Sequence, residues 1–206
     1  MKSNMTIIDK KKVTDFNHLN LFKVKYLDRK GTDKSWIYAS RSGKDLIESE
    51  SGKDSIQSEN RDRSLPDAVV VVPFHVNKEK LVLIREFRVP LGDYQYGFPA
   101  GLMDKGETIE DTASRELREE TGLDLLRVVR ISPPIYSSSG MTDESVSLVF
   151  SFCMGTPSVK WNEDSEDIEV IMVSQKEAQK LVNAPDLKFD VKSWIVLSNF
   201  AQTGLL

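Results

Sequence analysis

Three glutamates near the middle of the chain, Glu116, Glu119 and Glu120, have the residue type and spacing that hold a divalent metal ion. On a helix, offsets of three and four place their side chains on neighbouring parts of one surface. Like charges at this spacing destabilise a helix by about 0.2–0.5 kcal/mol for each close pair. Because carboxylates, waters and a substrate phosphate are the usual ligands of Mg²⁺, we expect a metal site here. On spacing alone, the alternative is a solvated acidic helix face.

The residues around the glutamates decide between these two interpretations. Residues 101–123 read GLMDKGETIEDTASRELREETGL. Every fixed position of the Nudix box is present at its spacing in this stretch, so the chain resembles the Nudix hydrolases. The matching residues are Gly101, Glu107, Arg115, Glu116, Leu117, Glu119, Glu120, Gly122 and Leu123.

The same stretch has the local features of a helix that docks on a sheet. Ile109, Ala113 and Leu117 recur at offsets of four and form an apolar stripe. Gly122 can end the helix in a left-handed conformation, which glycine adopts most easily. We expect Glu107 in the first turn, near the positive end of the helix dipole.

The functional roles of the acidic helix follow from its chemistry and from the resemblance. Arg115 can donate forked hydrogen bonds to neighbouring carboxylates, so we expect it to position them in the catalytic centre. Glu116 and Glu120 are one turn apart and are the expected direct metal ligands. Glu119 is expected as a third ligand or as a catalytic residue that acts through a water. The resemblance adds the backbone carbonyl of Ala100 and implies Mg²⁺ as cofactor, with Mn²⁺ as a substitute.

An acidic loop ahead of the predicted strand 168–173 supplies a further catalytic candidate. In the ADP-ribose enzymes of the Nudix family, a glutamate of the corresponding loop acts as a base or orients the attacking water. By position, the resemblance assigns this role to Glu166, with Asp164 as the second candidate. The alternative is that the loop is only solvated.

The segment before the box narrows the resemblance. Residues 85–101, REFRVPLGDYQYGFPAG, are similar to the corresponding segment of ADP-ribose and other nucleoside-diphosphate-sugar pyrophosphatases. Arg85 and Arg88 are the nearest basic residues before the acidic helix and are the candidates for binding the diphosphate. The alternative is that one or both form surface ion pairs.

A loop at residues 133–144, PPIYSSSGMTDE, resembles the family segment that closes on the substrate, and Glu144 is its candidate substrate-binding residue. Two positions depart from the ADP-ribose pattern: Ser139 replaces a proline, and Gly97 replaces an acidic residue. Both departures concern the substrate and leave the predicted metal site unchanged.

The composition argues against several other classes of function. The chain has 206 residues, a net charge of −4 and a pI near 5.4, which is unlike a broad nucleic-acid surface. Cys153 is the single cysteine and is expected to be a buried, inert thiol. No apolar run has the length of a membrane span or the form of a signal peptide. We therefore expect a cytoplasmic protein that binds neither nucleic acid nor membrane.

The resemblance implies an α/β fold with a mixed sheet between helices, the Nudix fold, in residues 67–206, and the apolar pattern predicts its elements. The predicted strands are 68–76, 80–87, 125–132, 145–154 and 168–173, and the predicted helices are the acidic helix ending at Gly122, a helix from Ser174 and a last helix over 190–201. Residues 1–66 are expected to form a separate element. It has a loose segment 1–18, which Ile7 and Ile8 could anchor, an antiparallel ribbon (21–27 and 36–40) and a solvated polar loop (41–66), for which a lid or recognition segment is the alternative. The resemblance implies a homodimer through this ribbon.

The resemblance implies hydrolysis of the diphosphate bond of a nucleoside diphosphate linked to another group. ADP-ribose, giving AMP and ribose 5-phosphate, is the first candidate for this small-molecule substrate. One alternative keeps the chemistry and changes the substrate to another nucleotide sugar, a dinucleotide or a damaged nucleotide. The other is a sensor that binds ADP-ribose without cutting it, which the complete box disfavours.

Overall fold

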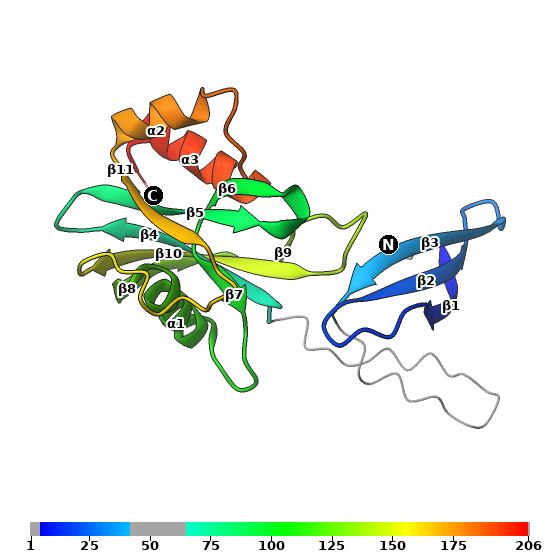
Figure 1. The fold of residues 1–206 in the computed structure, drawn as a ribbon. Coiled ribbons are helices and arrows are strands. Elements are labelled where there is room, and N and C mark those ends of the chain that lie inside the picture. Colours follow the sequence, from blue (N-terminus) through cyan, green and yellow to red (C-terminus); the bar gives the residue numbers. More distant parts are fainter. Residues whose placement is uncertain (1–4, 42–64, 206) are drawn as a thin grey trace. The chain divides into compact units, whose positions relative to one another are not determined.

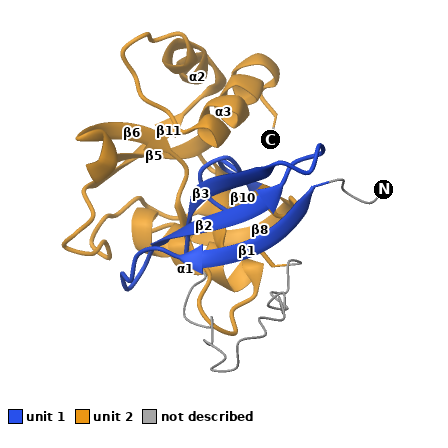
Figure 2. Ribbon diagram, turned by 90° about the vertical axis from the view of Figure 1, so that its right-hand side faces the viewer, with its two compact units in different colours: residues 1–63, 136–144 blue, residues 64–135, 145–206 orange. Residues whose placement is uncertain are grey.

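The computed structural model describes residues 5–41 and 65–205 and divides the chain into two compact units (Figure 2). The first unit contains residues 1–63 and 136–144, and the second contains residues 64–135 and 145–206. Each unit has its own β-sheet.

The sheet of the second unit has the mixed strand directions that the sequence predicts. Its main strand order is β11-β5-β4-β10-β8, with β6 beside β5 and β7 beside β4. Strands β4 and β10 are parallel, whereas β5 pairs with β4, β6 and β11 in antiparallel fashion. The bounds are β4 (Ala68–His75), β5 (Lys80–Arg88), β6 (Asp93–Gly97), β7 (Ala100–Leu102), β8 (Asp124–Ile131), β9 (Ile135–Tyr136), β10 (Ser145–Met154) and β11 (Ile168–Val173). The predicted α/β fold with a mixed sheet is confirmed.

Helices cover both faces of this sheet (Figure 1). Helix α1 (Ile109–Thr121) lies on one face, and α2 (Gln175–Val182) and α3 (Val191–Thr203) lie on the other. Alternate valines of β4 divide between the faces, because successive strand residues point in opposite directions. Val69 and Val71 pack beneath α1, whereas Val70 and Val72 pack beneath α2 and α3. Burial on both faces explains why this strand is almost continuously apolar.

Helix α1, which carries the acidic motif, has a defined start and end. Thr108 and Asp111 form a capping box at its N-terminus, and Gly122 ends it with a φ of 69°. The predicted C-terminal glycine is therefore confirmed. The prediction for Glu107 is wrong in detail: because Thr108 is the N-cap, Glu107 precedes the helix instead of lying in its first turn.

The first unit contains a three-stranded antiparallel sheet where the sequence predicts two strands. Its strands are β1 (Thr6–Lys12), β2 (Asn20–Leu27) and β3 (Asp33–Ser40), in the order β1-β2-β3. The prediction that residues 1–18 are loose is wrong for β1, because β1 pairs with the edge of β2 that β3 leaves open. Lys10 of β1 also lies over the ring of the buried Phe22, 4.7 Å from its centroid.

Residues 136–144 belong to the first unit because they bind β3. The backbone N–H of Ala39 donates to the carbonyl of Met141 at 2.8 Å. The indole N–H of Trp36 donates to the carbonyl of Gly140 at 3.0 Å. Just after β3, Arg41 forms an ion pair with Glu144 at 2.7 Å. Of the predicted polar loop 41–66, residues 42–64 lie outside the described residues.

None of the helices in residues 5–41 and 65–205 is long and apolar enough to cross a membrane.

Candidate active site

The carboxylate of Glu116 lies directly against the backbone of Gly101, which follows the first residue of β7. A Cβ atom built on Gly101 would be 1.9 Å from Oε1 of Glu116, closer than two non-bonded atoms can approach. Glycine is therefore required at position 101 for Glu116 to keep this position. Glu116 is only 8% exposed, and burial raises the pKa of its carboxyl group, partly offset by Arg115.

Glu120 lies one helical turn further along α1 and is also buried, with 6% exposure. One of its carboxylate oxygens accepts a hydrogen bond from the backbone N–H of Ala100 at 3.2 Å. Burial raises the pKa of Glu120 well above its usual value, and the nearby negative charges of Glu116, Glu86 and Glu166 raise it further. Two buried carboxylates of α1 thus meet the backbone of residues 100–101.

Arg115 binds three acidic side chains at once, as its predicted positioning role requires. Its guanidinium forms a two-point contact with Glu107, with Nε and Nη2 donating at 2.8 and 2.9 Å. Nη1 donates to Glu116 at 2.6 Å and to Glu119 at 3.2 Å. The Arg115 contact is the largest cause of the lowered pKa of Glu107, which falls to about 2. Nη2 also donates to the carbonyl of Leu102 at 3.0 Å, which ties β7 to the helix.

Glu119 is more accessible than Glu116 and Glu120. Its side chain is 49% exposed and contacts Arg115. Because half of this side chain is exposed, its charge carries only a small desolvation cost. Its predicted role as third ligand or catalytic residue stays a prediction.

Glu86 is a further carboxylate of the site, and sequence reasoning missed it. In β5 it continues the row of Val82 and Ile84, whose partners on β11 pack beneath α1, so it faces the same side as the acidic helix. Its side chain is largely buried and pairs with Arg88 at 2.9 Å. Burial raises the pKa of Glu86, and the charge of Glu166 acts in the same direction. The alternation of β5 was the signal that could have found it.

Arg85 and Arg88 lie on opposite faces of β5. Arg88 shares the α1 face with Glu86. Arg85 faces the other way, where it lies 3.4 Å from Glu169 of β11 and 3.8 Å from the ring centroid of Tyr94 in β6. The structure therefore brings Arg88 to the acidic face of the sheet and does not bring Arg85 there.

Glu166 lies in the loop before β11 and is half-buried, whereas Asp164 in the same loop is exposed. The negative charge of Glu166 is close enough to raise the pKa of Glu86, Glu116 and Glu120. The structure thus gathers Glu166 with the carboxylates of α1 and β5. Glu144 belongs to the first unit, so its predicted contact with the substrate stays a prediction.

The donor set of this site fits a hard divalent cation. Glu116, Glu120 and the carbonyl of Ala100 offer oxygen ligands only, as Mg²⁺ prefers. Within residues 5–41 and 65–205, no three acidic, histidine or cysteine side chains already form a metal cluster. Mg²⁺ does not need one, because it is usually held by one or two carboxylates together with waters and substrate phosphates.

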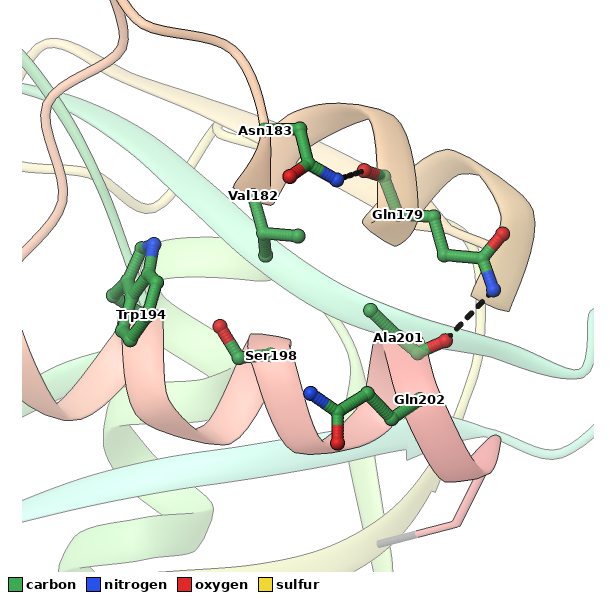
Figure 3. A pocket seen from close by; sticks show the side chains of 7 residues that line it. All are labelled: Gln179, Val182, Asn183, Trp194, Ser198, Ala201 and Gln202. Atoms are coloured by element: carbon green, nitrogen blue, oxygen red, sulfur yellow. Dashed lines mark hydrogen bonds between the residues drawn. The ribbon is translucent and has the colours of Figure 1, made fainter.

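A separate cavity of about 290 Å³ lies between α2 and α3 (Figure 3). Trp194 and Ser198 of α3 and Gln179 of α2 are among the residues that line it, and Gln179 donates to the carbonyl of Ala201 at 2.9 Å. This cavity is on the side of the sheet opposite α1, so it is distinct from the carboxylate site.

Cys153 lies beneath α1 and is fully buried. Burial raises the pKa of its thiol to about 12, so the reactive thiolate is scarce at neutral pH. The prediction of a buried thiol is confirmed.

Comparison with known proteins places this chain in a family. A model of the NUDIX domain matches residues 64–194. The putative nudix hydrolase 2 of Caenorhabditis elegans is 38% identical over 100 residues, which are 46% of this chain and 45% of that protein. The match thus spans less than half of that relative's length. The ADP-ribose pyrophosphatase of Bacillus subtilis is 33% identical over 129 residues, covering 62% of this chain and 68% of the relative.

A solved structure shows the same fold. The crystal structure of an ADP compounds hydrolase matches with a TM-score of 0.68 and covers 96% of this chain and 94% of its own chain. Its sequence identity is 18%, so this likeness concerns the fold alone.

Proposed function

Because the chain belongs to the Nudix family of hydrolases, we propose that it hydrolyses the diphosphate bond of a nucleoside diphosphate linked to another group. ADP-ribose, yielding AMP and ribose 5-phosphate, is the first candidate substrate. The observation that carries the proposal is the pair of buried carboxylates, Glu116 and Glu120, held against the backbone of Ala100 and Gly101. Burying two carboxylates without a full set of hydrogen-bond and charge partners destabilises the folded state. A bound cation is expected to offset this cost.

Mg²⁺, or Mn²⁺ in its place, would be held by Glu116, Glu120 and the carbonyl of Ala100, with Glu119 directly or through a water. Bound there, the ion would neutralise charge on the diphosphate oxygens and lower the pKa of a bound water. Arg115 keeps the carboxylates of Glu116 and Glu119 in place through the contacts described above.

The remaining residues act on the substrate and on the attacking water. Arg88 binds the diphosphate from the α1 face of the sheet, and Arg85 stays a weaker candidate because it lies on the other face. Glu166 accepts a proton from the attacking water or orients it. The water oxygen adds to one phosphorus, the P–O bond to the bridging oxygen breaks, and that oxygen leaves with the other phosphate.

The choice of ADP-ribose is supported by the name of the Bacillus subtilis relative, an ADP-ribose pyrophosphatase that is 33% identical. The structural relative is called an ADP compounds hydrolase, a broader description. Ser139 and Gly97 depart from the ADP-ribose pattern. These departures favour testing other nucleotide sugars and dinucleotides beside ADP-ribose.

Product chromatography with Mg²⁺ tests the proposal on a panel of ADP-ribose, UDP-glucose, GDP-mannose, NADH, diadenosine polyphosphates and 8-oxo-dGTP. AMP from ADP-ribose, lost in Glu120→Gln, is the expected result. Turnover of another panel member alone would support the proposed type of reaction but show that the substrate is not ADP-ribose. Tight binding of ADP-ribose without product formation would contradict the proposed hydrolysis and support the alternative of an ADP-ribose sensor.

We also propose that residues 1–66 form a dimerisation element and residues 67–206 the hydrolase domain, in a homodimer that works in the cytoplasm. Exposed apolar side chains on one face of the ribbon support the dimer: Ile37 of β3 and Leu21 of β2 are 57% and 41% exposed. Light scattering at micromolar concentration is expected to give twice the chain mass. A monomeric mass would remove this part of the proposal.

A further inference from the structure

Tyr94 of β6 is fixed by two side chains of the neighbouring strand β5. The guanidinium of Arg85 lies 3.8 Å from the centre of its ring, and Phe87 meets the ring edge-on with centroids 5.5 Å apart. Both contacts lie on the face of β5 opposite α1, where Arg85 has no access to the acidic helix. A cation over the ring and an aromatic ring beside it restrict the tyrosine to one orientation.

The hydroxyl of this fixed ring donates a hydrogen bond to the carboxylate of Asp167, the last residue before β11. That contact is the largest cause of the raised pKa of Tyr94. The backbone carbonyl of Asp167 accepts a second hydrogen bond, from the N–H of Phe87 at 3.0 Å. Asp167 is therefore attached to β5 through its main chain and to β6 through its side chain.

Glu166, the preceding residue, belongs to a turn that closes on itself. Its N–H donates to the carbonyl of Glu163 at 2.9 Å, and its carboxylate accepts from the N–H of Glu163 at 3.0 Å. At the other end of this turn, the amide of Asn162, oriented with its nitrogen toward both carbonyls, donates to Val159 at 3.1 Å and to Glu119 at 3.0 Å. The turn is thus attached to α1 at its start and to β5 and β6 at its end.

We propose that Tyr94 is a positioning residue for Glu166. By holding the side chain of Asp167, Tyr94 fixes the end of the turn that carries Glu166, and with it the position of the Glu166 carboxylate. Arg85 contributes from the far face of the sheet by holding the ring of Tyr94. This inference rests on the proposed function, because it concerns the place of Glu166 in the same site.

The Tyr94→Phe variant tests the proposal, because it removes only the hydroxyl and keeps the ring contacts. With ADP-ribose and Mg²⁺, kcat is expected to fall about tenfold, since small misplacements of a catalytic group are costly. KM should stay within about twofold, because Arg88 and the carboxylates of α1 are not touched. Tyr96→Phe is the matched control: it removes the same group two residues away on β6, where the ring packs at a tilt against Phe189 with centroids 5.4 Å apart. It should keep the wild-type kcat.

Variants of Asp167 show whether the effect passes through this contact. Asp167→Asn keeps an acceptor oxygen and should hold kcat within about threefold of the wild type, whereas Asp167→Ala should match Tyr94→Phe. The double variant Tyr94→Phe/Asp167→Ala should be no slower than either single variant. If the two single losses multiply, the residues act independently and the proposal is overturned.

Amide hydrogen exchange measures how firmly the turn is held, independently of catalysis. The amides of residues 163–167 are expected to exchange faster in Tyr94→Phe than in the wild type and in Tyr96→Phe. A wild type that turns over no panel member would overturn the proposed function, and the exchange measurement would still read the attachment of the turn. An active wild type with an unchanged kcat and unchanged exchange in Tyr94→Phe would overturn the role of Tyr94 alone.

Discussion

Helices cover both faces of the eight-stranded sheet, yet the kinds of side chains buried beneath them differ. Beneath α2 and α3 the packing is mainly apolar, with Leu197 and Phe200 in one core with strand residues. Beneath α1 a valine-rich layer is accompanied by the buried carboxylates of Glu116 and Glu120. Buried carboxylates weaken a fold unless they are paired, so the α1 face carries an energetic cost that the proposed metal ion would offset.

Strand β5 shows how one sequence serves both faces. Arg85 and Arg88 are three residues apart, a spacing that puts two side chains on one face of a helix but on opposite faces of a strand. Arg88 accordingly pairs with Glu86 on the acidic side, whereas Arg85 stacks on Tyr94 on the other. The same residue type is thus a substrate-binding candidate in one place and a structural support in the other.

The largest loss of activity is expected for Glu120→Gln, on the acidic face of the sheet. The substitution keeps the shape of the side chain and removes a negative charge from the centre of the proposed metal site. Hydrolysis should fall on the order of 1000-fold, the size of effect seen when a central electrostatic group is removed. Steady-state turnover with saturating Mg²⁺ measures it, and a loss smaller than about tenfold would contradict the assignment of Glu120 as a ligand.

The same substitution should have the opposite effect on stability in metal-free protein. Because the folded-state pKa of Glu120 is raised, the wild type loses stability as the pH rises from the unfolded pKa to the folded pKa. Glu120→Gln lacks this loss, so it should be the more stable protein at pH 8, with an advantage that shrinks toward pH 4. Urea unfolding in EDTA measures the difference at each pH. An advantage that grows as the pH falls would contradict the assigned direction of the shift.

A smaller loss is expected for Gly101→Ala, which pushes on Glu116 from the strand side. The added methyl group must displace the carboxylate, because the two would otherwise be 1.9 Å apart. Activity should fall about 100-fold. Since the displaced atoms are the far end of a flexible side chain, the melting temperature should change little. Activity within about threefold of the wild type would remove the argument.

The sequence predicted the fold and the acidic helix well because their signals are local. The apolar stripe of α1, its terminal glycine and the capping box of Ser174 and Glu177 at α2 are each contained within a few residues. Burial on both faces gave β4 its nearly continuous valines, which identified it as a core strand. The spacing of the Nudix box predicted which residues form the site. The match to the NUDIX domain model confirms the predicted family.

The remaining features depend on pairing between distant segments, which local patterns do not encode. Strand β1 forms because β2 has an open edge, and nothing in residues 6–12 alone requires it. Glu86 was overlooked because its role depends on which sheet face α1 covers. The contact between Tyr94 and Asp167 joins residues 73 positions apart. Such contacts follow from strand register, which is fixed only when the whole sheet is assembled.

A comparison of Arg88→Ala with Arg85→Ala tests the division of β5 directly. Loss of Arg88 should raise KM for the diphosphate substrate about tenfold, because a charge-assisted hydrogen bond to phosphate is removed. Arg85→Ala should leave KM within about twofold and lower kcat slightly, through the freed ring of Tyr94. Steady-state kinetics of both variants decide the matter. A larger KM effect at Arg85 would reverse the assignment of the two faces.

The smallest effect is expected at Cys153, which shares the α1 face with Glu120. Both groups have a raised pKa, but Cys153 owes its shift to burial alone, whereas neighbouring carboxylates add to that of Glu120. Because no charged group of the proposed site perturbs its pKa, the buried thiol of Cys153 is not expected to take part in catalysis. Cys153→Ala should therefore keep the wild-type kcat and KM. A thiol reagent should likewise fail to modify Cys153 until the protein is unfolded, because the thiolate is scarce and covered. Rapid modification with loss of activity would show that this face holds a second reactive group.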